Sequence, residues 1–418
     1  MNYSVLQQLF AWYRQPLTSF LTLLWTLLLA GCGGVQGSGV TLSVDGRGSS
    51  FLAVQDGLGA WRPLAANAEH ALTLGDPAGR YGLLSVCAGG DPGDPNGGLG
   101  GNLSVNVQHA LLADAPAASA GCAADEPAPA PVRLTGTARG LAAGEYGNLY
   151  VGDASALLDS AAPTGRLELP PGRYDLVASR YRGASRVPDR LVLHPGVDLA
   201  RSRVVDLDFG GPAAFSPARA ELALSGLRPG ELLSGSAELL TPGGTSALLG
   251  EYTGGTTLPY ADVPAERRFG SRLRAALQGF TYDDRTKAGS SRSLSRFLTN
   301  DPRLRLPAPL GAPELTLNAA ETVRPAARWR AYRAGRGVYA QFYSQIRGGR
   351  AVSYRLSQSS AWLAGRPLSY TLPDFSALAG WDAAWDLVPG QDLFWDVSFS
   401  QETPLQTLFV SRSGVLVP

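Results

Sequence analysis

Histidine, aspartate and tryptophan are the residues of this chain best suited to chemistry, and none of them falls in an established catalytic spacing. The three histidines, His70, His109 and His194, lie far apart, so we expect strand-end or surface positions rather than a triad or a zinc site. The sequence also contains no nucleophile elbow, no phosphate-binding glycine loop and no zinc-protease motif. We therefore predict a non-enzymatic protein that needs no cofactor and no metal.

Two short acidic segments offer oxygen ligands or an acid pair, and we expect both to be turns. Asp91, Asp94 and Asn96 carry hard oxygen atoms that suit calcium, but their spacing differs from that of an EF-hand loop. Asp283 and Asp284 are adjacent, and adjacent residues on a strand point to opposite faces. Neither segment is a predicted site.

A third acidic group supports an alternative hypothesis. Asp374, Asp382 and Asp386 lie close in sequence to Trp381 and Trp385, as would be expected in the cleft of a surface hydrolase. Such an enzyme needs two or more of these carboxylates to converge on one pocket. Without that convergence, the same residues belong to a binding surface or to the core.

Aromatic residues concentrate towards the C-terminal end, where five of the six tryptophans after residue 31 follow Pro313. The alternation over 338–343 places Tyr339, Gln341 and Tyr343 on one face of a strand. If the opposite face is core, these three form an exposed strip that stacks on sugars; the alternative is that the rings fill the core. The candidate ligand-binding residues are Tyr339, Gln341, Tyr343, Trp381 and Trp385.

Charge is unevenly distributed along a nearly neutral chain. Residues 267–366 contain 19 basic and 5 acidic residues, and 322–366 contain nine arginines and no acid. One interpretation is a basic surface that meets an anionic envelope polymer or lipid headgroup. We favour the other, in which the arginines pair with acids of the same domain, for example Arg355 with Asp396 across neighbouring strands.

Two cysteines, Cys87 and Cys122, remain once Cys32 is assigned to an N-terminal signal. An even pair in an exported chain predicts a disulfide, because exported proteins fold in an oxidising compartment. The chain-entropy model gives a loop of this length roughly 3–4 kcal/mol of stabilisation.

The N-terminal signal ends in Leu29-Ala30-Gly31-Cys32, which follows a polar start and a short apolar stretch. This tetrapeptide resembles the lipobox of bacterial lipoproteins. The resemblance implies that residues 1–31 are a signal peptide and that Cys32 is lipidated and becomes the first residue of the mature protein. Several acyl chains on one residue hold a protein stably on a bilayer.

A weak repeat of roughly 90 residues divides the remaining chain. Apolar alternating segments start at Val40, Val132, Glu221 and Glu314, and strand-like segments headed by an aromatic follow at Tyr81 and Tyr174. Short strands with frequent turns predict an all-β protein of tandem β-sandwiches, and the pattern resembles Ig-like, fibronectin type III and transthyretin-like domains. The predicted sandwiches cover 32–126, 132–211, 218–308 and 313–418.

Together these features predict a lipid-anchored protein of the cell envelope, at the outer membrane or cell surface, with a binding, adhesion or structural role. Its expected partners are the membrane, through the anchor, and envelope polysaccharide or other envelope proteins. Export argues against a nucleic-acid partner. The alternative is a polysaccharide-binding protein or hydrolase that acts through the C-terminal domain.

Overall fold

The computed structural model describes residues 40–88, 102–122, 129–252, 254–299, 303–319, 322–332, 336–364, 366 and 368–416. Within these ranges the regular structure consists of β-strands and two 3-10 turns, Ala265–Arg267 and Ala383–Trp385, so the all-β prediction is confirmed. No helix of the described residues is long and apolar enough to cross a membrane. The predicted signal, Cys32 and the 91–96 loop lie outside the described residues.

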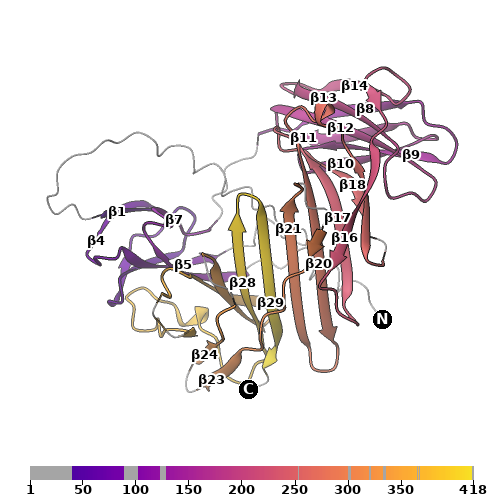
Figure 1. The fold of residues 1–418 in the computed structure, drawn as a ribbon. Coiled ribbons are helices and arrows are strands. Elements are labelled where there is room, and N and C mark those ends of the chain that lie inside the picture. Colours follow the sequence, from indigo (N-terminus) through magenta and orange to yellow (C-terminus); the bar gives the residue numbers. More distant parts are fainter. Residues whose placement is uncertain are drawn as a thin grey trace. The chain divides into compact units, whose positions relative to one another are not determined.

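One strand arrangement recurs three times along the chain (Figure 1). In each copy the first strand lies between the fourth, to which it is antiparallel, and the seventh, to which it is parallel. The remaining strands form a second sheet in the order third, second, fifth, sixth. We call these copies repeats 1 to 3, and each is a β-sandwich.

Repeat 1 has seven strands. They are β1 (Val40–Asp45), β2 (Phe51–Asp56), β3 (Trp61–Leu64), β4 (Glu69–Leu74), β5 (Arg80–Ala88), β6 (Leu103–Leu111) and β7 (Ala117–Ser119).

Repeat 2 adds one short strand, β15, to the same arrangement. Its strands are β8 (Val132–Arg139), β9 (Glu145–Val151), β10 (Ala154–Asp159), β11 (Thr164–Leu169), β12 (Arg173–Arg182), β13 (Arg190–Asp198), β14 (Arg203–Asp208) and β15 (Ala214–Phe215).

Repeat 3 again has seven strands. They are β16 (Ala218–Ser225), β17 (Leu232–Leu240), β18 (Ser246–Glu251), β19 (Thr257–Asp262), β20 (Arg272–Asp283), β21 (Ala288–Phe297) and β22 (Arg303–Arg305).

The fourth segment departs from this arrangement at one position. Its strand β24 is antiparallel to β23 on one side, where the other repeats have a parallel seventh strand, and to β27 on the other. Its strands are β23 (Glu314–Ala319), β24 (Val323–Arg328), β25 (Val338–Arg347), β26 (Arg350–Ser359), β27 (Ser369–Thr371), β28 (Leu393–Thr403) and β29 (Gln406–Leu416).

The strands follow from local alternation and from glycine turns. β11 alternates strictly between exposed and buried residues, with Leu167 and Leu169 inward, as expected for a half-buried strand. The turn between β25 and β26 uses Gly348 and Gly349, both at positive φ, a conformation that glycine adopts without a Cβ clash. Period-two patterning and turn chemistry therefore specify the individual strands.

The described strands belong to two compact units, although four sandwich ranges were predicted. The first unit combines the described residues up to 125 with Pro313–Val397 and those from 415; the second combines those of Glu126–Ala312 with Ser398–Gly414. Sandwiches merge within each unit because strand edges pair. In the first, β26 pairs in parallel with β6, and in the second β21 pairs with β29.

The first unit has three layers around the strands β25, β26, β6, β5, β2 and β3. On one face the sheet β4-β1-β7 covers β5 and β2, with Leu42, Tyr81 and Leu83 in the core (Figure 1). On the opposite face, described residues within 322–332 and 360–392, which include β24 and β27, cover the sheet over a core that contains Leu84 and Tyr354. Strand β5 is therefore buried on both faces.

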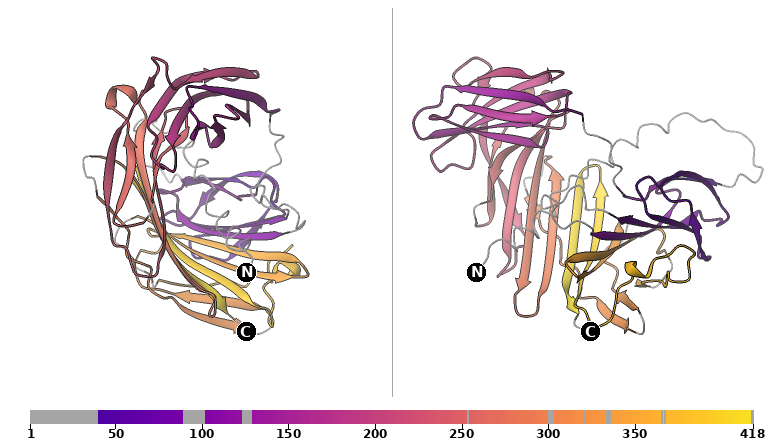
Figure 2. Two further views of the ribbon diagram at one scale, coloured as in Figure 1. Left: turned by 90° about the vertical axis from the view of Figure 1, so that its right-hand side faces the viewer. Right: turned by 180° about the vertical axis from the view of Figure 1, so that it is seen from behind.

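The second unit holds repeats 2 and 3 together through hydrogen bonds. The two sheets of repeat 2 face each other around Leu134, Leu176 and Phe209 (Figure 2). Buried Asp175 accepts hydrogen bonds from the backbone N–H groups of Gly196 and Gly243, at 2.7 Å each. Since Gly243 belongs to the β17–β18 turn, one carboxylate joins the two repeats.

Candidate functional site

The predicted aromatic strip on β25 faces inward, so the expectation of an exposed strip is wrong. Tyr339, Gln341 and Tyr343 are 4%, 2% and 0% exposed, whereas Val338 is 38% exposed on the opposite face. The alternation itself was correct, but described residues within 322–332 and 360–392 cover the polar face of β25. The alternative in which the rings fill the core agrees with these exposures.

This inward face forms a layer of buried polar side chains, which we call the polar layer. Its members come from β25, β26 and β6, and each is at most 4% exposed. They are Tyr339, Gln341, Tyr343, Gln345, Tyr354, Gln358 and His109.

One end of the polar layer is fully hydrogen-bonded to the covering segment. The Gln345 amide donates to the carbonyl of Val388 and accepts from its N–H group, both at 2.9 Å. The Tyr354 hydroxyl donates to the carbonyl of Trp385 at 2.7 Å, and Arg347 donates to that of Ala384 at 2.6 Å. These bonds position the loop that carries Trp381 and Trp385.

The other end of the polar layer contains polar atoms without partners. Both amide atoms of Gln358, His109 Nδ1 and the indole nitrogens of Trp329 and Trp362 are buried, and no described residue offers them a hydrogen bond. Gln341 Nε2 has none either. A buried polar group left unpaired costs about 1–3 kcal/mol, so this concentration calls for a physical explanation.

His109 lies in the middle of this end, not at a strand end or on the surface as predicted. Its ring stacks on Trp362 with centroids 4.5 Å apart, and its Nε2 is 2.7 Å from the Tyr370 hydroxyl. Burial, and then the charge of Arg366, lower the pKa of His109 to about 3. On the paired strand, a Cβ at Gly82 would lie 3.0 Å from His109 Nδ1 and 2.8 Å from Trp61, so glycine allows this packing.

Trp381 and Trp385 lie next to each other at the bonded end of the layer. Their rings are 5.1 Å apart and perpendicular, and both pack against Phe51. Each tryptophan is partly buried. They cap the core and leave only part of their surface for a ligand.

The three carboxylates of the hydrolase hypothesis each hold local structure. Asp382 accepts from the N–H of Ala384 at the start of a 3-10 turn, at 2.8 Å. Asp374 accepts from Ser376 and pairs with Arg324. Asp386 accepts from the indole N–H of Trp381 at 3.1 Å.

The pKa values of Asp386 and Asp374 are shifted in opposite directions from the ordinary value of an aspartate. Burial raises the pKa of Asp386, and the nearby charge of Asp374 adds to the rise. The hydrogen bond from Ser376 lowers the pKa of Asp374, to which the Arg324 charge also contributes. Separated pKa values are typical of acid and base pairs, although all three carboxylates already have structural partners.

The arginines of 322–366 have mixed partners. Arg324 pairs with Asp374, Arg328 lies 4.0 Å from Glu314, and Arg336 lies 3.7 Å from Asp114 of repeat 1. Arg366 lies over the Trp362 ring at 4.3 Å. The arginines of 322–366 therefore form ion pairs both within the fourth segment and with repeat 1. Others contact a backbone carbonyl or an aromatic ring.

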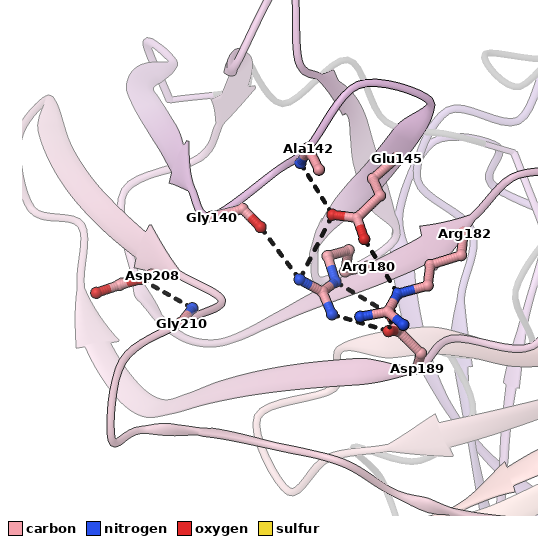
Figure 3. A network of polar contacts seen from close by, with 8 residues as sticks. All are labelled: Gly140, Ala142, Glu145, Arg180, Arg182, Asp189, Asp208 and Gly210. Carbon is pink, nitrogen blue, oxygen red and sulfur yellow. Dashed lines mark hydrogen bonds and ion pairs between the residues drawn. The ribbon is translucent and has the colours of Figure 1, made fainter.

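The second unit buries two arginines, each paired with an acid. Arg180, 7% exposed, donates to both oxygens of Asp189 at 3.0 and 2.8 Å and to the carbonyl of Gly140 at 3.1 Å (Figure 3). Glu145 lies 3.5 Å from Arg180 and pairs with Arg182. The hydrogen bonds that Arg180 donates to Asp189 raise the pKa of the Arg180 guanidinium.

Repeat 3 contains a more deeply buried pair. Arg292, 2% exposed, donates through Nε to Glu231 at 2.7 Å and through Nη1 to the carbonyl of Pro307 at 2.7 Å. Glu231 also lines an open groove of about 430 Å³ with Arg186, Leu232 and Tyr252. The Glu231 carboxylate is already paired with Arg292, so this ion pair adds no net charge to the groove.

The remaining predicted residues have structural positions. Cys87 and Cys122 form a disulfide, which confirms the predicted pairing. Asp283 accepts from the N–H of Arg285 in a turn, as expected. His70 lies on β4 and His109 on β6 of the first unit, whereas His194 lies on β13 of the second unit. The described residues contain no cluster of side chains able to hold a metal ion.

Sequence inspection missed Gln358 and the role of His109. Val105, Val107 and His109 share one face of β6, and that phase would have placed the histidine inside. Gln358 follows the buried Leu356 on β26 in the same way. A polar residue that continues the alternation of buried apolar residues along a strand was therefore the feature that could have predicted these buried positions.

The architecture defines a class, a tandem β-sandwich protein, and comparisons add little to it. No family model matches the chain, and no curated protein matches it. Similar solved structures include the Bacillus anthracis TIE protein (9% identity, 63% of this chain and 49% of that chain, TM-score 0.14). Another is the FN1–FN3 domains of chicken CNTN1 (8% identity, 65% and 88%, TM-score 0.16). This chain spans about half the length of the first, and such TM-scores support no argument about function.

Proposed function

We propose that this is a lipid-anchored protein of the cell envelope with a non-enzymatic binding role. The Cys87–Cys122 disulfide is the observation that carries the proposal, because structural disulfides persist in exported proteins. The Leu-Ala-Gly-Cys sequence ending at Cys32 supplies the anchor. A binding role is preferred to catalysis because Asp374, Asp382 and Asp386 are each engaged in local hydrogen bonds.

Intact mass and detergent partitioning of the full chain test the anchor. The wild type is expected to gain acyl mass on Cys32 and to enter the detergent phase, while Cys32→Ala stays aqueous. The Cys87–Cys122 disulfide should form in both proteins, which shows that both were exported and folded. An unmodified wild type that stays in the aqueous phase would overturn the proposal.

A polysaccharide-binding or hydrolytic role at Trp381 and Trp385 is the second candidate. It is favoured by the raised pKa of Asp386 beside the lowered pKa of Asp374. A hydrolase would release reducing ends from envelope polysaccharide and lose this activity in Asp386→Asn, while the exposed Asp382→Asn retains it. Retained binding without any release would leave a binding function only.

A further inference from the structure

The groove of the second unit follows a stretch of β17 whose edge is open. Strand β18 pairs with β17 only as far as Ser236, which lies opposite Glu251, and the N–H of Tyr252 then donates to the carbonyl of Gly235 at 2.8 Å. Beyond that point, Leu232–Ser234 pair with β20 on one side and with no described residue on the other. Both leucines of this stretch line the groove of about 430 Å³, so the open edge has space beside it.

This open edge presents main-chain groups to the groove. In an antiparallel strand the N–H and C=O groups of one residue point to the same side, and that side alternates along the chain. Because the Gly235 carbonyl points towards β18, the N–H and C=O groups of Leu233 point the same way. A strand edge with an unpaired donor and acceptor is a template for another extended chain.

The side chains that line the groove add apolar surface and one available cation. Leu232 is 59% exposed. Arg186 of repeat 2 donates through Nη1 to Glu251 at 3.0 Å, and no described residue accepts from its other N–H groups. Glu231 adds no net charge, because it is paired with Arg292. The guanidinium of Arg186 therefore has free donors in the fork geometry that matches a carboxylate.

We propose that this groove binds an extended, acidic peptide segment of a partner protein, which adds a short strand to the open edge of β17. The peptide main chain exchanges hydrogen bonds with Leu233, an apolar side chain packs on Leu232, and a carboxylate accepts from Arg186. A sugar acid would meet the cation but would not match the donor and acceptor of a strand edge. The inference rests on the proposed binding role and names the class of partner.

Fluorescence anisotropy of labelled peptides with the full-length protein in detergent tests the site. The probe is a capped six-residue peptide that alternates valine and threonine and ends in aspartate. Matched forms end in lysine, or carry N-methyl groups on one or the other set of alternate amides. Saturable binding is expected for the aspartate form, and binding about ten-fold weaker for the lysine form, which loses the bond to the cation. Only one of the two N-methylated forms should lose binding, because only one set of amides faces β17.

Two variants with matched controls make the result specific. Arg186→Glu should reverse the preference, so that the lysine form binds more tightly than the aspartate form. Its control is Arg166→Glu, an exposed arginine on β11 in the other sheet of repeat 2. Leu232→Asp should weaken binding of the aspartate form by about ten-fold, and its control is Val204→Asp, which changes a 68% exposed residue on the edge strand β14. Both controls should bind like the wild type.

Three results would overturn the site: no saturable binding of any peptide, equal binding of both N-methylated forms, or an unchanged preference in Arg186→Glu. Glucuronate serves as the anionic comparator. If it binds through Arg186 while the peptides do not, the groove takes a sugar acid and the peptide proposal is wrong. Because acylation of Cys32 is measured separately, failure here is distinguishable from failure of the envelope proposal.

Discussion

The two compact units differ in the largest polar side chains that they bury. In the second unit these are Arg180 and Arg292, and each has an acid and a carbonyl as partners. In the first unit they are neutral, and Gln345 is fully bonded while Gln358 has no partner among the described residues. A buried unpaired charge costs far more than an unpaired amide, and each of these two arginines has an acidic partner.

Breaking the most deeply buried ion pair should have the largest effect. Arg292→Met leaves Glu231 buried without its partner, and we expect a loss of about 3–5 kcal/mol of stability. Denaturant unfolding followed by far-ultraviolet circular dichroism measures it, with the exposed Arg285→Met as control. A loss no larger than that of the control would remove the contrast between the units.

Removing the bonded glutamine should cost less. Gln345→Leu leaves the N–H and carbonyl groups of Val388 without side-chain partners, and we expect a loss of about 3 kcal/mol. The same unfolding measurement applies, and hydrogen exchange at Val388 should accelerate. Unchanged exchange there would show that these bonds do not hold the loop.

Acid should destabilise the first unit through His109. Its folded pKa lies below the unfolded value, so protonation favours unfolding: the stability from burying the neutral ring is complete above about pH 6.5 and is lost as the pH falls towards 3. At pH 5 this loss amounts to about 2 kcal/mol. His109→Phe should flatten the pH dependence of unfolding between pH 7 and 5, whereas the control His70→Gln should not. Parallel pH profiles for all three proteins would contradict the neutral assignment.

The smallest effect is expected at the unpaired glutamine. Gln358→Leu should change stability by less than about 1 kcal/mol, because an apolar group replaces an amide without protein partners. Comparison with Gln345→Leu makes this a direct test of the two ends of the polar layer. Equal losses would mean that both amides are bonded in solution.

Sequence patterns predicted the strands better than their assembly. The landmarks at Val40 and Val132 begin β1 and β8, the first strands of their repeats. The landmark at Glu314 falls on β23, which pairs beside β24 instead of taking the first-strand position. Alternation identifies a strand but contains no information about its neighbours, which are chosen by long-range pairing.

The amino-acid sequence by itself determined the all-β class, the turns and the pairing of Cys87 with Cys122, because these depend on local periodicity, glycine conformation and an even number of cysteines. Only the tertiary structure decided which face of β25 is buried and which buried glutamine is bonded. The physical reason is that a strand offers two faces of equal periodicity, and a covering segment from elsewhere in the chain selects one of them. The bonding of Gln345 and the isolation of Gln358 follow from where that segment places its backbone.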